Sequence, residues 1–340
     1  MTAAAMSIEA TAPPMSDALD EMLEASLASL AGHVPRAVWE RVLLAPARDI
    51  LARPAKQLRA ELVGLGAALA GSRVAPPAMV IGAIEMLHAG SLVIDDIEDG
   101  AEHRRGDVAL HRLYGVPVAL NAGNWMYFCA FALIDRAPVS DAVRAALHRA
   151  MLRAVLDCHA GQALDVGLDV TELPREQLRA IVERTSALKS GALTRLAAEL
   201  GAIAGGASPE RLAAIGSFGA SLGLALQMLD DLGGVTCEHR LAKGCEDLQL
   251  SRPTWPWLWL AEHGDDALWT SLTRWGRRVA REHQEAELLA RVIGEIVKLP
   301  GRAAIARQLA ATRAAIRDLG ATELATAVDA QLDRLAVAYV

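Results

Sequence analysis

Two segments of the chain are apolar on nearly all sides and end in acidic residues. They run from Ala78 to Asp99 and from Leu212 to Leu232. A helix without a polar face must lie inside a fold and be covered by other helices. Two buried helices that both end in aspartates indicate one cavity whose mouth is lined by carboxylates.

The rest of the chain favours helices as well. Hydrophobic residues make up 53% of the sequence but aromatic residues only 4%, so side chains that favour strands are scarce. Helical periodicities are separated by single Pro or Gly residues, without a linker or repeat. We therefore expect an all-α fold, with residues 1–16 as a disordered leader and residues 17–340 as one domain. The expected helices cover roughly residues 17–32, 36–51, 54–72, 77–101, 107–113, 117–135, 139–168, 175–204, 208–233, 254–263, 266–293, 301–318 and 321–338.

Several classes of protein are excluded or disfavoured. The net charge of −7 gives no global attraction to nucleic acid or to an anionic membrane surface. Four cysteines are too few for a disulfide framework in 340 residues. The N-terminus lacks the basic and apolar regions of a signal peptide. Proline, asparagine or serine interrupts the uncharged stretches 115–134 and 212–229, so we expect core helices, no membrane span and a cytoplasmic protein.

The two acidic clusters indicate a divalent cation. Asp95 and Asp99 lie one turn apart on one helix face, where like charges repel. Asp230 and Asp231 follow Gln227 at the end of the other apolar helix. Carboxylate oxygens combined with water and phosphate oxygens suit Mg²⁺. Either cluster alone is typical of a solvated helix end; the two together favour a metal.

Basic residues near these elements indicate a phosphate-containing ligand. Only four of the 34 basic residues are lysines, so this chain uses arginine at most positions that carry positive charge, and a lysine is unusual in it. Arginine binds phosphate with two parallel hydrogen bonds and lysine as a compact point charge. Each cation alone is typical of a surface charge, but together they form a set: Lys56, Arg59, Arg104, Arg105, Lys189 and Arg252.

At this point the motifs carry a resemblance. The segment EMLHAGSLVIDDIEDGAEHRRG (Glu85 to Gly106) resembles the first aspartate-rich motif of the trans-prenyltransferases, the isoprenyl diphosphate synthases, and most of all their geranylgeranyl diphosphate synthases of eukaryotic type. Further segments match the family in the same order: PAKQLR from Pro54, GVPVALNAGN from Gly115, HAGQALD from His159, LKSGAL from Leu188, LALQMLDDL from Leu224 and CEDLQLSRPTWP from Cys245.

This resemblance implies an isoprenoid synthase helical bundle around a deep apolar cavity, usually a homodimer, with the two aspartate motifs facing each other across the mouth. It assigns the Mg²⁺ ions that hold an allylic diphosphate to Asp95, Asp96, Asp99, Asp230 and Asp231, beside Gln162 and Asp165. It assigns that diphosphate to Arg104, Lys189 and Arg252, with Ser190 among the substrate-binding residues. It assigns the binding of isopentenyl diphosphate to Lys56, Arg59, His88 and Arg105. It places Gln227 near the developing cation.

The implied reaction is chain elongation. An allylic diphosphate ionises, the double bond of isopentenyl diphosphate attacks the cation, and a proton leaves. In the family, small residues four and five positions before the first aspartate allow a longer product. Here they are Ser91 and Gly90, which predicts geranylgeranyl diphosphate. The alternative for Gly90 is that it is small only to admit a neighbouring helix.

Three positions depart from the family pattern. Gly234 replaces an acidic residue of the second motif, Asn124 stands where aspartate is common, and Arg252 stands where lysine is usual. Because of Gly234 and Glu238, a class I terpene cyclase on the same fold is an alternative function. A non-catalytic regulatory subunit of a prenyl synthase is the other alternative.

Overall fold

The computed structural model describes residues 15–28, 32–54, 57–319, 326, 328 and 329. Within these ranges the chain is helical apart from loops and one short β-hairpin, which confirms the all-α class. The chain forms two compact units, one of residues 1–60 and 76–144 and the other of residues 61–75 and 145–340. Residues 1–14 of the expected leader lie outside the described ranges, and helix α1 begins at Met15.

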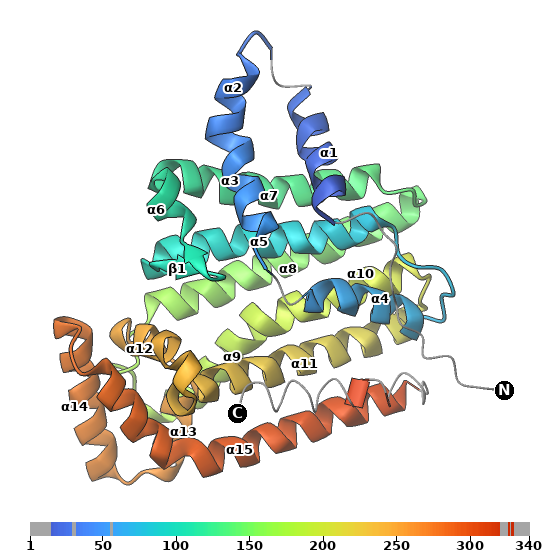
Figure 1. Cartoon of the computed structure of the whole chain (residues 1–340). Coiled ribbons are helices and arrows are strands. Elements are labelled where there is room, and N and C mark those ends of the chain that lie inside the picture. Colours follow the sequence, from blue (N-terminus) through green and yellow to red (C-terminus); the bar gives the residue numbers. More distant parts are fainter. Residues whose placement is uncertain (1–14, 29–31, 55–56, 320–325, 327, 330–340) are drawn as a thin grey trace. The chain divides into compact units, whose positions relative to one another are not determined.

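The first unit is organised around two long helices, α5 (Ala78–Asp99) and α7 (Val116–Arg136), which lie side by side (Figure 1). Helix α5 ends at Gly100, whose φ of 64° is the left-handed conformation that stops a helix. The other elements of this unit are α1 (Met15–Ala28), α2 (Arg36–Trp39), a π-helical turn (Glu40–Leu44), α3 (Ala45–Ala52), the start of α4 (Leu58–Leu69), β1 (His103–Arg104), β2 (Asp107–Val108) and α6 (Leu110–Tyr114).

The second unit is organised around α11 (Pro209–Thr236), which packs against α10 (Ala192–Ala204) and α15 (Ala286–Asp318) (Figure 1). Ser208 begins α11 by accepting a hydrogen bond from the Arg211 N–H, and Pro209 occupies the first position, where no N–H is needed. The remaining elements are most of α8 (Asp141–Gly167), a 3₁₀ turn (Arg175–Gln177), α9 (Leu178–Ser186), a π-helical turn (Ala187–Gly191), a 3₁₀ turn (Glu238–Arg240), α12 (Leu241–Gln249), α13 (Trp255–His263) and α14 (Asp266–Glu282).

Three expectations about the elements are wrong. Helix α15 runs through Pro300, because the turn around it is fixed by packing: Gly301 is buried against the Trp259 ring. The break lies instead at His283 and Glu285, which both have positive φ. Helix α12 was not expected, and the start of the expected helix 107–113 is strand β2. The last expected helix, 321–338, lies mostly outside the described residues.

Among the described residues, α5, α7 and α11 are long and apolar enough to cross a membrane by length and composition. Between 44% and 50% of the apolar window of each is buried inside the protein.

Candidate active site

The acidic end of α5 contains one aspartate that is buried and two that are not. Asp96 is 2% exposed and accepts a hydrogen bond of 2.6 Å from Arg104 Nε. Burial raises the pKa of Asp96, and the Arg104 hydrogen bond opposes that rise. Asp95 and Asp99 are half-buried one turn apart, and Asp95 Oδ2 lies 3.5 Å from Arg104 Nη2. Asp96 therefore anchors Arg104, and Asp95 and Asp99 present the more accessible carboxylates.

Next to this cluster the first unit gathers cations around a neutral histidine. Burial lowers the pKa of His88 well below its usual range, and the nearby charges of Arg59 and Arg105 lower it further. Burial raises the pKa of Glu85, which the same two arginines oppose. His88 Nδ1 is buried without a hydrogen-bond partner among the described residues. An excess of positive charge beside an unused polar group suits an anionic ligand.

In the second unit, a π-helical turn carries Lys189 and Ser190. π-Helical turns are rare and frequently occur at functional sites. Lys189 Nζ lies 2.5 Å from Asp165 Oδ2 on α8. The turn fits because its neighbours are glycines: a Cβ at Gly161 would lie 2.9 Å from the Lys189 backbone nitrogen, and one at Gly223 would lie 2.5 Å from the Ser190 carbonyl oxygen. Neither position can carry a side chain without moving the turn.

A chain of hydrogen bonds connects this turn to the second aspartate motif. Ser190 donates to Gln227 Oε1, and Gln227 Nε2 donates to Asp231 Oδ1 at 2.6 Å. Asp231 Oδ2 accepts from the Trp255 backbone N–H at 3.0 Å. Arg252, 6% exposed, donates to the Asp165 carbonyl oxygen at 2.9 Å. Lys189, Ser190, Gln227, Asp231 and Arg252, expected from the sequence to act together, thus converge in this unit.

The two aspartates of the second motif differ in their surroundings. Asp231 is 8% exposed, and burial raises its pKa to about 7, with a further rise from the Asp247 charge and opposing effects from its hydrogen bonds to Trp255 and Gln227. The Asp230 side chain is 39% exposed and forms an ion pair with Arg240. Arg240 is a site residue that the sequence does not indicate, because nothing in the local pattern connects it to an aspartate ten residues earlier.

The glycine in the second motif has a packing function. Gly234 faces Gly244 of α12, and a Cβ on Gly244 would lie 2.0 Å from the Gly234 carbonyl oxygen. A Cβ on Gly234 itself would lie 3.2 Å from the Gly244 Cα, so the close approach of α11 and α12 leaves little room for a side chain at this position. Glu238, the residue that kept a cyclase motif open, has a side chain that is 76% exposed and an ion pair of 2.9 Å with Arg291.

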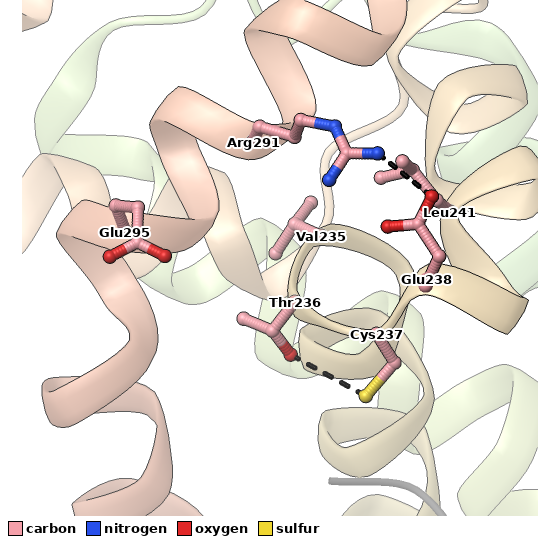
Figure 2. Close-up of a pocket in the computed structure, with 7 residues that line it drawn as sticks. All are labelled: Val235, Thr236, Cys237, Glu238, Leu241, Arg291 and Glu295. Carbon is pink, nitrogen blue, oxygen red and sulfur yellow. Dashed lines mark hydrogen bonds and ion pairs between the residues drawn. The ribbon is translucent and has the colours of Figure 1, made fainter.

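Figure 2 shows Glu238 and Arg291 at a small pocket beyond the end of α11, which Cys237 and Glu295 also line. Arg291 thus holds the Glu238 carboxylate at this pocket.

The surroundings of Gly90 favour the alternative that it is small to admit a neighbouring helix. A Cβ at Gly90 would lie 2.8 Å from the Gly123 carbonyl oxygen and 3.2 Å from Met126 Cβ, both on α7. Gly90 is small because α7 crosses α5 there. Ser91 is half-buried and donates to the His88 carbonyl oxygen at 2.8 Å. Lys56 lies outside the described residues.

The donor set fits Mg²⁺ bound partly by substrate. Among the described residues, no three His, Cys, Asp or Glu side chains converge on one point. Mg²⁺ usually takes one or two carboxylates together with water and phosphate oxygens. Asp95 and Asp99 are the carboxylates suited to such a site in the first unit, and Asp230 is the one suited to such a site in the second.

Comparison with known proteins decides the family. The family model for polyprenyl synthetase matches residues 40–293, about three quarters of the chain. The chain belongs to the polyprenyl synthetase family. This polyprenyl synthetase chain is 37% identical over 211 residues to a short chain isoprenyl diphosphate synthase of Methanothermobacter thermautotrophicus, covering 61% of the chain and 62% of that protein.

Two further relatives differ in their named products. The geranylgeranyl pyrophosphate synthase 2 of Zymoseptoria tritici is 31% identical, with 64% of each protein covered. A (2E,6E)-farnesyl diphosphate synthase of Mycobacterium tuberculosis is 33% identical, with 66% of this chain and 60% of that protein covered. The alignments with these relatives thus span less than two thirds of their lengths.

Solved structures confirm the isoprenyl synthase helical fold. The geranylgeranyl pyrophosphate synthase of Corynebacterium glutamicum, solved with isoprenyl diphosphate and magnesium, superposes on this polyprenyl synthetase chain with a TM-score of 0.77. The two are 20% identical, and the superposition covers 95% of this chain and 96% of that one.

Proposed function

We propose that this chain is a Mg²⁺-dependent trans-prenyltransferase that condenses isopentenyl diphosphate with allylic diphosphates to make geranylgeranyl diphosphate. One observation carries the proposal: adjacent residues of one hairpin serve two different clusters. Arg104 pairs with Asp96 and lies near Asp95, and Arg105 opposes the raised pKa of the buried Glu85; both arginines lower the pKa of His88. A carboxylate cluster for a metal-bound diphosphate and a cation cluster for a second diphosphate are what two-substrate elongation requires.

The candidate residues divide between the two substrates of this reaction. Lys189, Arg252 and Arg104 stabilise the diphosphate that leaves the allylic substrate, because negative charge develops on it during ionisation. Arg59, Arg105 and Lys56 hold isopentenyl diphosphate. The neutral His88 donates or accepts a hydrogen bond there without adding charge. Gln227, fixed by Ser190 and Asp231, presents an amide dipole to the developing cation.

In the first unit Mg²⁺ would be held by Asp95 and Asp99, and in the second unit by Asp230. When bound, Mg²⁺ neutralises the diphosphate leaving group and so lowers the barrier to ionisation. Asp96 and Asp231 act instead by fixing Arg104 and Gln227, because both carboxylates are buried in contacts with the protein.

The assigned product length rests on the resemblance to geranylgeranyl diphosphate synthases and on relatives named for that product. A farnesyl synthase is among the relatives as well. The Glu238–Arg291 ion pair speaks against the cyclase alternative, because the Glu238 carboxylate is neutralised by the protein. The cation cluster around His88 speaks against it too, since a cyclase has no second diphosphate to hold.

We further propose a cytoplasmic homodimer without a membrane span. Exposed apolar side chains lie on one face of α7, with Leu120 40% and Phe128 73% exposed. Others lie on α8, with Leu152 55% and Leu156 63% exposed. Apolar stripes of this kind are typical of surfaces that are covered by a partner.

The experiment is incubation of the purified protein with Mg²⁺, isopentenyl diphosphate and each allylic diphosphate in turn, followed by product identification by mass. We expect a twenty-carbon diphosphate and consumption of isopentenyl diphosphate. A fifteen-carbon end product would correct the product length. Cyclic hydrocarbons formed without isopentenyl diphosphate would disprove elongation.

A further inference from the structure

We propose that Arg53 is a positioning residue for the cations of the first unit: it fixes the hairpin that carries Arg104 and Arg105. The inference rests on the proposed function, because Arg105 is assigned there to isopentenyl diphosphate. Arg53 itself is no ligand, since its side chain is only 5% exposed. It acts through the residues that it holds.

Arg53 lies at the C-terminal end of α3 and contacts two elements at once. Its Nε donates to Asp49 Oδ1 at 2.7 Å, one turn back on α3. Its Nη1 donates to the backbone carbonyl oxygen of Arg104 at 3.0 Å. The planar guanidinium can make both contacts because its donors point in different, fixed directions.

Two further hydrogen bonds connect α3 to the hairpin region. Tyr114, the last residue of α6, donates its hydroxyl to Asp49 Oδ2 at 3.1 Å. Arg105 Nη1 donates to the Ile50 carbonyl oxygen at 3.3 Å. Helix α3 therefore holds the hairpin in three ways. Arg53 binds the hairpin backbone, the Ile50 carbonyl oxygen binds the Arg105 side chain, and Asp49 binds α6, which follows the hairpin.

The hairpin needs this support. Its two strands are two residues long each, and an isolated two-stranded hairpin is marginally stable at best. Its turn residues Arg105 and Gly106 have φ of 54° and 84°. Positive φ at both positions favours Asn, Asp or Gly, so Arg105 is strained there. The surroundings must hold a strained residue in this conformation.

Arg53 also begins the segment that leads to the other cations. It precedes Pro54 and has the extended ψ of 148° that a following proline requires. Two residues further on lies Lys56, outside the described residues, and Arg59 lies in the first turn of α4. The residue that holds the hairpin thus also ends α3, directly before the part of the sequence that contains the other cations assigned to isopentenyl diphosphate.

The first experiment measures the anchor without any substrate. Backbone hydrogen exchange of residues 103–108 is compared in the full-length wild type, Arg53→Gln, Arg53→Lys and Asp49→Asn. We expect exchange in the hairpin to become about tenfold faster in Arg53→Gln and Asp49→Asn. Arg179→Gln is the control, because Arg179 pairs with Glu183 at 2.9 Å on an exposed surface of α9 and should leave the hairpin unchanged.

The second experiment measures the effect on substrate. For Arg53→Gln we expect the KM for isopentenyl diphosphate to rise about tenfold and the KM for the allylic diphosphate to rise as well, because Arg104 and Arg105 lie on the same hairpin. Arg53→Lys keeps the charge but cannot reach both acceptors, so it should recover only part of the loss. If Arg53→Gln does not fold, Asp49→Asn and the nearly isosteric Tyr114→Phe should show the same rise in both KM values on a smaller scale.

Three results would overturn the proposal. Unchanged hairpin exchange in folded Arg53→Gln would show that Arg53 is no anchor. Wild-type behaviour of Arg53→Lys would show that its charge alone matters. Faster exchange with an unchanged KM for isopentenyl diphosphate would separate the anchor from the substrate. A failure of the proposed function gives a different result, because the wild type itself would then neither bind nor consume isopentenyl diphosphate.

Discussion

At the scale of single residues, the two aspartate motifs share one feature: in each, the second aspartate faces into the protein. Asp96 is held by Arg104, and Asp231 by Gln227 and the Trp255 backbone. The first aspartate of each pair, Asp95 or Asp230, is more accessible. Carboxylates of one motif therefore have different functions, which their adjacent positions in the sequence do not reveal.

Replacing Asp96 should damage the fold as well as the chemistry. Asp96→Ala removes the buried partner of Arg104 and leaves it the longer, 3.5 Å contact with Asp95, so we expect the free energy of unfolding to fall by about 3 kcal/mol. Asp99→Ala removes a half-buried carboxylate and should change it by less than about 1 kcal/mol while abolishing turnover. Urea denaturation and turnover measurements check both variants. Equal stability losses would contradict the separate roles.

The raised pKa of Asp231 predicts a pH-dependent stability. Its folded pKa of about 7 lies above its ordinary value of 3.8, so folding favours the protonated form. The free energy of unfolding should therefore fall as pH rises from about 4 to 7, by at most about 4 kcal/mol from this group. Denaturation in chelator at pH 5 and pH 8 should show this fall in the wild type.

Variants identify the group responsible. Asp231→Asn cannot ionise and should show a smaller fall between pH 5 and pH 8. Asp141→Asn, at a fully exposed carboxylate, should retain the wild-type fall. A fall of wild-type size in Asp231→Asn would assign the pH dependence to another group.

At the scale of elements, glycines decide where helices approach each other. Gly90 and Gly123 allow contact between α5 and α7, and Gly234 and Gly244 between α11 and α12. Gly223 allows α11 to pass the π-helical turn that carries Lys189. The positions of the catalytic candidates thus depend on residues without side chains.

Gly90→Ala should destabilise the protein without changing product length. The new Cβ would lie 2.8 Å from the Gly123 carbonyl oxygen, so we expect a loss of about 1–3 kcal/mol in the free energy of unfolding. Gly64→Ala on α4 is the matched control, because a Cβ there meets nothing within 4 Å, and it should stabilise by about 0.5–1 kcal/mol. Thermal denaturation and product analysis test this. If folded Gly90→Ala formed a shorter product, position 90 would face the product cavity and this prediction would be wrong.

At the scale of the whole molecule, the exposed apolar stripes bear on assembly. If α7 and α8 each contribute to a homodimer, charge on either stripe should oppose it. Phe128→Glu and Leu156→Glu should therefore raise the dimer dissociation constant at least about tenfold in analytical ultracentrifugation. Leu299→Glu, at a site on α15 that is 76% exposed, is the control and should leave association unchanged. Wild-type association of both variants would place the interface elsewhere.

The sequence by itself determined the all-α class and the two acidic helix ends, because helical periodicity and the spacing of Asp95 and Asp99 are local properties. The family followed from ordered motifs for the same reason. Contacts between distant segments were decided only by the tertiary structure. Arg53 reaches the Arg104 carbonyl oxygen 51 residues away, and Gly90 meets α7. No local pattern specifies which side of a helix meets which neighbour, since that depends on how all the side chains pack together.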